Sequence, residues 1–291
     1  MISAKRISLI SIVLIAAFFV VWAKIDNDFS KLNSFRENIK NTSLAIASET
    51  VSPALGENFQ TKLNTSGLEL DVKTALVKDL SLDRVLFEKN TGDRWPVASL
   101  TKIMTAIIAA EKIGTDKQVV FTKEIIATYG DTGKFKAGEI YSVEDLIRAM
   151  FAVSSNDAAV AIADFYGKDN FVNEMQKKAV DLGMLQTTFA DASGLSFLNQ
   201  STAQDMEKMV EYVFKNHPEF LDISRQKNVE LKEIGTGRKR ILKNMNEFAG
   251  EEDFLGGKTG FIDSSMGNLI SLFKYRGSVL AITVFGAGER F

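Results

Sequence analysis

The chain has 291 residues, with 35 lysines and arginines against 37 aspartates and glutamates, one histidine and no cysteine. The net charge of −2 offers no basic surface typical of nucleic-acid binding, and it is too small to steer a charged partner. The lack of cysteine excludes disulfides, cysteine peptidases and a lipid-modified cysteine anchor, and leaves too few ligands for structural zinc. We therefore expect neither a metal nor a cofactor.

An uncharged apolar stretch at residues 7–23 follows Lys5 and Arg6. At 1.5 Å per residue it would span about 26 Å, slightly less than a bilayer core of about 30 Å. It predicts a membrane anchor or signal segment at residues 1–23, with an anchor favoured because Trp22 suits a membrane interface. Cleavage after this stretch is the alternative. The basic residues before it predict that the rest of the chain lies on the extracytoplasmic face.

Residues 24–67 are rich in asparagine, serine, threonine, lysine and glutamate, and they predict a polar linker. A flexible linker of this length would span about 35 Å root-mean-square. We expect the remaining residues, 68–291, to form one domain, because they are enough to bury a large core. Within it, we predict strands at 74–80, 84–89, 268–274 and 278–285 and helices at 99–111, 142–153 and 156–166, the helical part extending over about 99–222.

The helix predicted at 99–111 begins with serine, leucine, threonine and lysine. A serine hydroxyl is a weak nucleophile until a nearby base takes its proton, and Lys102 is the candidate base for Ser99. Residues three positions apart on a helix lie about 5–6 Å apart on one face. Lysine acts as a base only if burial or a neighbouring cation, such as Lys258, lowers its pKa from about 10.4.

The serine–lysine pattern also has plainer interpretations. Average residue usage produces roughly one such pair in a chain of this length, and Ser224 with Lys227 is another example. Ser99 by itself fits the N-cap of a helix that follows Pro96. The pattern therefore gains meaning only together with other motifs.

A second motif, Ser154-Ser155-Asn156, lies where the helices at 142–153 and 156–166 meet. A turn at this joint can direct the first and third side chains outward. Serine and asparagine also favour ordinary turns and helix caps, so the motif fits a simple connection as well.

A third motif, Lys258-Thr259-Gly260, comes before the two C-terminal strands, in a region that predicts an edge strand. The glycines of this region also fit ordinary strand ends. A phosphate-binding loop is disfavoured because it needs a glycine where Glu252 stands, and the acidic residues 251–253 would repel phosphate.

The single histidine, His217, lies beside Pro218 at the end of a predicted amphipathic helix. A serine–histidine–aspartate triad would have to use it, yet a histidine at a helix C-terminus more often complements the helix dipole. A lysine-assisted serine site is the hypothesis that remains.

The three motifs in this order resemble the penicillin-recognising serine enzymes, and most closely the D-alanyl-D-alanine carboxypeptidase family of low-mass penicillin-binding proteins. Residues 95–106 resemble the nucleophile segment of that family almost throughout, and residues 189–195 and 244–246 are similar to further family segments. The resemblance implies an α+β fold of the β-lactamase/transpeptidase type. In it, an antiparallel sheet of about five strands, built from both ends of the domain, packs against a large helical insertion.

The resemblance also implies roles in acylation. Ser99 would be the acylated nucleophile, and Lys102 would be the base that takes its proton. Ser154 would relay a proton to the leaving amine, while Asn156 would hold Lys102 and the substrate amide. The backbone N–H groups of Ser99 and Phe261 would form the oxyanion hole.

Substrate-binding roles follow from the same resemblance. Lys258 would supply positive charge near the substrate carboxylate, Thr259 would hydrogen-bond that carboxylate, and Gly260 completes the motif. Arg290 resembles an arginine that helps to bind this carboxylate in relatives, although the loop before it is shorter here.

These expectations predict a serine-type D-Ala-D-Ala carboxypeptidase that removes terminal D-alanine from peptidoglycan stem peptides and is acylated by β-lactam antibiotics. DD-endopeptidase or transpeptidase action remains an alternative, because the choice of acceptor depends on the shape of the groove. A β-lactamase is disfavoured, since no Glu-x-x-Leu-Asn segment lies between Asn156 and Lys258. An inactive scaffold that only binds wall peptides is the non-enzymatic alternative. Expected partners are the stem peptide, β-lactams and, through residues 1–23, the membrane, but no nucleic acid.

Overall fold

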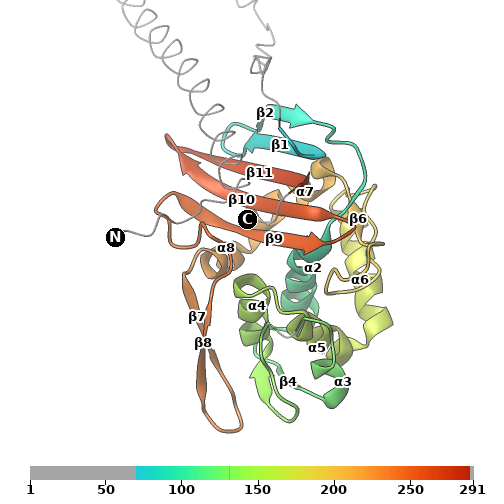
Figure 1. Ribbon diagram of the computed structural model, residues 1–291, viewed down its shortest axis with the longest axis vertical. Coiled ribbons are helices and arrows are strands. Elements are labelled where there is room, and N and C mark those ends of the chain that lie inside the picture. The colour runs from blue at the N-terminus through green and yellow to red at the C-terminus, as the bar shows by residue number, and fades with distance from the viewer. Residues whose placement is uncertain (1–69, 131, 289–291) are drawn as a thin grey trace, which may run out of the picture. The chain divides into compact units, whose positions relative to one another are not determined.

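The computed structural model describes residues 70–130 and 132–288. It has an α+β fold in which a five-stranded antiparallel sheet of order β2-β1-β11-β10-β9 lies against a helical region (Figure 1). The sheet strands are β1 (Thr74–Asp79), β2 (Arg84–Lys89), β9 (Phe254–Ile262), β10 (Met266–Tyr275) and β11 (Ser278–Ala287). The predicted fold class is confirmed, and both ends of the domain contribute strands to this sheet.

Short turns and one long-range pairing build the sheet. The turn between β10 and β11 has Arg276 at φ +48° and Gly277 at φ +86°, and positive φ at two successive residues suits the twist of a tight hairpin. The strands β1 and β11, which are distant in sequence, pair in antiparallel register from Thr74 opposite Phe285 to Asp79 opposite Leu280. The opposite edge of the sheet is β9, which pairs only with β10.

The helical region fills the sequence between β2 and β9. Its α-helices are α2 (Thr101–Ile108), α3 (Lys123–Ile126), α4 (Val143–Ala152), α5 (Asn156–Tyr166), α6 (Lys168–Asp181), α7 (Ala203–Asn216) and α8 (Pro218–Ser224). A 3-10 turn, η1 (Ala98–Leu100), precedes α2, and a π-helical turn, η2 (Ala109–Ile113), follows it. Short two-stranded pairs join β3 (Trp95–Pro96) to β6 (Gln200–Ser201) and β4 (Gln118–Val120) to β5 (Ile140–Ser142).

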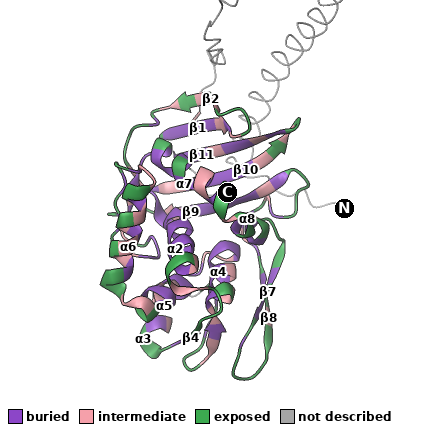
Figure 2. Cartoon of the chain, turned by 180° about the vertical axis from the view of Figure 1, so that it is seen from behind, coloured by how far each residue is buried: buried purple, intermediate pink, exposed green. Residues whose placement is uncertain are grey.

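The central helix α2 is buried along its whole length, as its nearly uniform apolar sequence predicted. In the burial view of Figure 2, α2 is purple throughout. The helices α7 and α8 contact β11 and β9 of the sheet, whereas α4, α5 and α6 contact one another or α2. The nucleophile candidate Ser99 therefore lies just before the N-terminus of a helix that the surrounding core holds in place.

A hairpin of β7 (Asn228–Lys232) and β8 (Lys239–Lys243) extends from the domain beside α4 (Figure 1). The sequence analysis did not predict it. Its signal is the alternation in β7, where Val229 and Leu231 are buried between exposed neighbours.

The predicted terminal segment 1–23 and linker 24–67 lie outside the described residues. Among residues 70–130 and 132–288, no helix has the length and apolar character needed to cross a membrane. The proposed domain boundaries therefore stay predictions.

Candidate active site

Ser99 lies in the turn η1, directly before α2. The turn is held by a hydrogen bond from the backbone N–H of Val97 to the Asn199 carbonyl (2.9 Å), and Ala98 adopts a positive φ of +48°. Helix α2 has no side-chain N-cap, so the alternative role of Ser99 as a cap does not hold. The hydroxyl of Ser99 is instead directed at Lys102.

Lys102 makes three polar contacts through Nζ, which lies 2.9 Å from Ser99 Oγ, 2.7 Å from Asn156 Oδ1 and 2.5 Å from the Ser193 carbonyl oxygen. A neutral lysine amine has two N–H donors and one lone pair. It can donate to the two carbonyl oxygens, of Asn156 and Ser193, and keep its lone pair for the hydroxyl proton of Ser99. The geometry thus suits a base.

The Lys102 side chain is completely buried. Burial disfavours the charged form and lowers the pKa of Lys102 to about 7, although the negative charges of Asp191 and Asp157 act in the opposite direction. Of the two causes expected from the sequence, burial and a neighbouring cation, burial is therefore the main one. A neutral amine is available at physiological pH.

The loop after α6 supplies the Ser193 carbonyl that accepts from Lys102. One carboxylate oxygen of Asp191, Oδ1, accepts from the backbone N–H groups of Ser193 and Gly194 (both 2.6 Å), and Oδ2 accepts from that of Ser196 (2.7 Å). The Asn199 side chain also accepts from the backbone of this loop, at Ala190 (2.5 Å). Sequence reasoning did not single out Asp191 or Asn199, whose only signal was the similarity of residues 189–195 to a family segment.

Ser154 and Lys258 form the second half of the site. Lys258, in the edge strand β9, is 1% exposed, and its Nζ donates to Ser154 Oγ over 2.9 Å and to the Thr259 carbonyl over 2.7 Å. Ser154 lies in the turn between α4 and α5 with a positive φ of +55°. Such a backbone costs about 1 kcal/mol or more in a non-glycine residue, and it is common at functional sites.

Asn156 is the first residue of α5, two positions after Ser154. Its Oδ1 accepts from Lys102, and its Nδ2 donates to the Tyr129 carbonyl over 2.8 Å. The neighbouring Ser155 caps α5 by accepting from the N–H of Ala158 (3.2 Å). The middle serine of the motif is thus structural, whereas the outer two residues face the site.

Two glycines allow backbone segments to meet around Ser99. A Cβ added to Gly260 in β9 would lie 3.1 Å from the Ser99 nitrogen and 3.1 Å from the Val97 oxygen. Gly194 has φ +83°, and a Cβ there would overlap the Ala98 carbonyl oxygen. Glycine is therefore required at position 194, and at position 260 a side chain would be tight against the nucleophile turn.

The structure brings together Ser99, Lys102, Ser154, Asn156 and Lys258, with Thr259 and Gly260 beside them on β9. Phe261 follows on the same strand, opposite Gly267 of β10. Arg290 lies outside the described residues. His217 contacts Glu111 (3.1 Å) and Glu219 (3.0 Å) and stacks on Phe220. Within the described part of the chain it forms no hydrogen bond to Ser99 or Ser154.

No group of histidine, cysteine and acidic residues within 70–130 and 132–288 is arranged to hold a metal ion. The chemistry that this arrangement supports is nucleophilic attack by a serine with a lysine base.

Comparison with known families agrees with this geometry. The family model of D-alanyl-D-alanine carboxypeptidases matches residues 60–289. A D-alanyl-D-alanine endopeptidase of Haemophilus influenzae is 33% identical over 208 residues, which cover 69% of this chain and 70% of that protein. The D-alanyl-D-alanine carboxypeptidase DacF of Bacillus subtilis is 34% identical over 159 residues, 52% of this chain. The chain covers only 41% of DacF.

A solved structure with a similar fold is penicillin-binding protein D2 of Listeria monocytogenes in its ampicillin-bound form. It matches with a TM-score of 0.66 and 29% sequence identity, over 76% of this chain and 91% of that one. The chain therefore shares its family with proteins named D-alanyl-D-alanine peptidases and its fold with a penicillin-binding protein.

Proposed function

The chain belongs to the D-alanyl-D-alanine carboxypeptidase family, and on this premise we propose that it removes the terminal D-alanine of peptidoglycan stem peptides through an acyl-enzyme on Ser99. The observation that carries this proposal is the position of the buried Lys102 amine, 2.9 Å from Ser99 Oγ. The activity needs a nucleophile, a base and a proton donor for the leaving amine, and each has a candidate in the site.

In the first step, Ser99 Oγ attacks the carbonyl carbon of the penultimate D-alanine while its proton moves to the lone pair of Lys102. The carbonyl oxygen becomes an oxyanion, for which the backbone N–H groups of Ser99 and Phe261 are the proposed donors. The low pKa of Lys102 favours this proton transfer because the amine starts neutral near pH 7.

In the second step, the tetrahedral intermediate expels the amine of the terminal D-alanine, which needs a proton. The proton that Lys102 accepted from Ser99 passes to this amine, which leaves Lys102 neutral again. Ser154 is the proposed relay, and its hydroxyl is held 2.9 Å from Lys258 Nζ. The ester on Ser99 then reacts with water, which restores the serine hydroxyl and releases the shortened peptide. Water as acceptor makes the reaction a hydrolysis rather than a transpeptidation, and the terminal D-alanine as leaving group makes it a carboxypeptidation.

The substrate carboxylate is proposed to bind at the third motif. Lys258 supplies positive charge there, and Thr259 supplies a hydroxyl from the next position of the edge strand β9. Arg290 remains a proposed contributor on the resemblance alone.

Endopeptidase action on cross-linked peptides is the second candidate, favoured by the 33% identity to the endopeptidase of Haemophilus influenzae. β-Lactams are proposed to acylate the same serine, as supported by the ampicillin-bound relative. A location on the extracytoplasmic face of the cell membrane, held by residues 1–23, is proposed from the basic residues and apolar stretch at the N-terminus.

The test uses the full chain with a labelled penicillin and with a pentapeptide ending in D-Ala-D-Ala. We expect a stable adduct on Ser99 and release of free D-alanine, with both lost in a Ser99→Ala variant by at least ~10⁴-fold. Ser196→Ala, in the loop beside the site, is the matched serine control. Rapid turnover of penicillin would favour a β-lactamase. Cleavage of a cross-linked dimer in preference to the pentapeptide would favour the endopeptidase. Failure to form any penicillin adduct would refute both the carboxypeptidase and the β-lactamase.

A further inference from the structure

A basic groove lies beside the catalytic centre and has no part in the mechanism above. It is a hollow of about 490 Å³, and its lining includes Lys134, Lys136, Arg238, Arg240 and Lys243 together with Val153. No carboxylate side chain of the described residues belongs to this lining. The groove thus gathers five cations in a protein whose net charge is −2.

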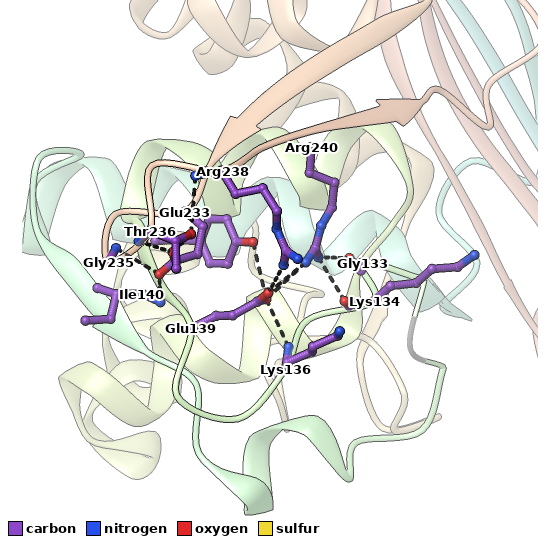
Figure 3. A network of polar contacts seen from close by, with 11 residues as sticks. Gly133, Lys134, Lys136, Glu139, Ile140, Glu233, Gly235, Thr236, Arg238 and Arg240 are labelled. Carbon is purple, nitrogen blue, oxygen red and sulfur yellow. Dashed lines mark hydrogen bonds and ion pairs between the residues drawn. The ribbon is translucent and has the colours of Figure 1, made fainter.

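The arginines of the basic groove are held in place by one carboxylate behind them (Figure 3). Glu139 accepts from Arg238 Nη2 (2.6 Å) and from Arg240 Nη2 (3.0 Å). Arg240 Nη1 also donates to the carbonyls of Gly133 (2.7 Å) and Lys134 (2.9 Å). The guanidinium of Arg240 lies 5.4 Å from the Phe135 ring centroid, which adds a cation–π contact. The β7–β8 hairpin and the 132–136 segment therefore form a preorganised wall.

Glu139 balances one of the two arginine charges, which leaves the groove strongly positive. Lys134, Lys136 and Lys243 are exposed, and among residues 70–130 and 132–288 none of them forms an ion pair with a carboxylate. Exposed lysines facing one hollow repel each other, and an anion placed among them relieves that repulsion. The groove is suited to a negatively charged ligand.

The groove borders the turn that carries Ser154. Val153 in its lining directly precedes Ser154, whose hydroxyl lies 2.9 Å from Lys258 Nζ. The N–H of Met245, just after β8, donates to the carbonyl of Ala152 at the end of α4 (2.8 Å), which ties the hairpin to the same helix end. An anion in the groove therefore sits within reach of a peptide whose scissile bond is at Ser99.

We propose that the basic groove is a subsite for a second, free carboxylate of the acyl-donor peptide, carried by a residue before the scissile bond. The inference rests on the proposed peptidase function. A carboxylate on the substrate itself fits better than an anion on a separate molecule, because the groove begins one residue from the catalytic centre. The chain then prefers acidic stem peptides over peptides in which that carboxylate is amidated.

The size of the preference follows from the exposure of the cations. A charge pair at an exposed site is weak, so each lysine contributes a factor of roughly 1.4 to five in kcat/KM, and the groove as a whole about tenfold. Screening should shrink this preference, since the Debye length falls from about 10 Å at 0.1 M salt to about 3 Å at 1 M.

The experiment compares two pentapeptides ending in D-Ala-D-Ala that differ only in one upstream group, a carboxylate or its carboxamide. Release of D-alanine by the full chain is measured at low and high salt. We expect about a tenfold higher kcat/KM for the acidic peptide in low salt, falling towards equality at 1 M. A Lys136→Gln, Lys243→Gln double variant should retain at most about a twofold preference. Lys123→Gln, on the exposed surface of α3, is the matched control and should keep the full preference.

Equal rates for the two peptides with the unmodified chain would overturn the groove assignment and leave the peptidase proposal intact. A preference that survives in the double variant, or that does not respond to salt, would also overturn it. Release of D-alanine from neither peptide would refute the proposed function and this inference together. Should the double variant unfold at a lower temperature, the two single variants and the salt series on the unmodified chain still decide the matter.

Discussion

Two regions of this molecule surround a basic side chain with oxygen atoms, but one suits the side chain to act as a base and the other suits it to join two segments. At the catalytic centre, Lys102 is fully buried and faces two carbonyl oxygens and the hydroxyl of Ser99. In the β7–β8 hairpin, Arg240 faces the Glu139 carboxylate and two backbone carbonyls, but its side chain keeps 18% of its exposure.

The difference has two causes, the complete burial of the Lys102 amine and the permanent charge of an arginine side chain. Loss of water lowers the pKa of Lys102 to about 7, so that its lone pair becomes available. Arg240 faces a full counter-charge instead, and its five donors hold two segments together. The surroundings of Lys102 suit it to proton transfer, whereas the contacts of Arg240 hold the β7–β8 hairpin against the 132–136 segment.

The largest effect should come from replacing Lys102 with a side chain that stays protonated. Arginine does not lose its proton at any physiological pH, so Lys102→Arg should slow acylation by labelled penicillin on the order of 10³-fold. Lys177→Arg, in the exposed ion pair with Glu174 on α6, is the control and should leave the rate unchanged. If Lys102→Arg acylates within tenfold of the unmodified chain, Lys102 is not the base.

A smaller effect, on stability, is expected from disturbing the close packing that excludes water from Lys102. Gly194→Ala would place a Cβ on the Ala98 carbonyl oxygen at a positive φ of +83°. We expect a loss of about 3 kcal/mol in unfolding free energy, seen as a fall of roughly 10 °C in the midpoint of thermal unfolding. Gly92→Ala is the control, because nothing lies within 4 Å of its added Cβ. Similar midpoints for the two variants would contradict the packing argument.

The pH dependence of acylation tests the same desolvation directly. Only the neutral amine accepts the Ser99 proton, and its fraction grows as pH rises through the lowered pKa of about 7. The rate of penicillin acylation should therefore rise about tenfold per pH unit below pH 7 and level off above it. A profile that keeps rising to about pH 10 would mean that Lys102 titrates like a lysine in water.

The smallest effect should come from the hairpin, where partial exposure weakens each contact. Glu139→Gln removes the counter-charge of Arg238 and Arg240 and should lower the unfolding free energy by about 1–2 kcal/mol. Glu230→Gln on the same hairpin breaks the exposed pair with Lys239 and should cost less than about 1 kcal/mol. Chemical denaturation of both variants gives the comparison, and equal losses would show that burial at Glu139 has no influence.

Local patterns determined much of this fold in advance. The strands predicted at 74–80 and 84–89 correspond to β1 and β2, and the helix pair around Ser154 appears as α4 and α5. The β7–β8 hairpin escaped prediction because its alternation is short and its contacts with Glu139 come from a distant segment.

The sequence by itself determined which residue types could react. Spacing predicted that Ser99 and Lys102 lie close together, although the helix expected from residue 99 begins at Thr101 and Ser99 lies in the preceding turn η1. The lack of cysteine and of further histidines left lysine as the base. Only the tertiary structure decided that the Lys102 amine is buried away from water. It also decided that the loop held by Asp191 brings the Ser193 carbonyl to Lys102. Lys258 and Ser154, 104 positions apart in the sequence, are likewise brought together only by the fold. The physical reason is that a pKa and a proton path depend on what surrounds an atom in space, and those surroundings come from segments far apart in the chain.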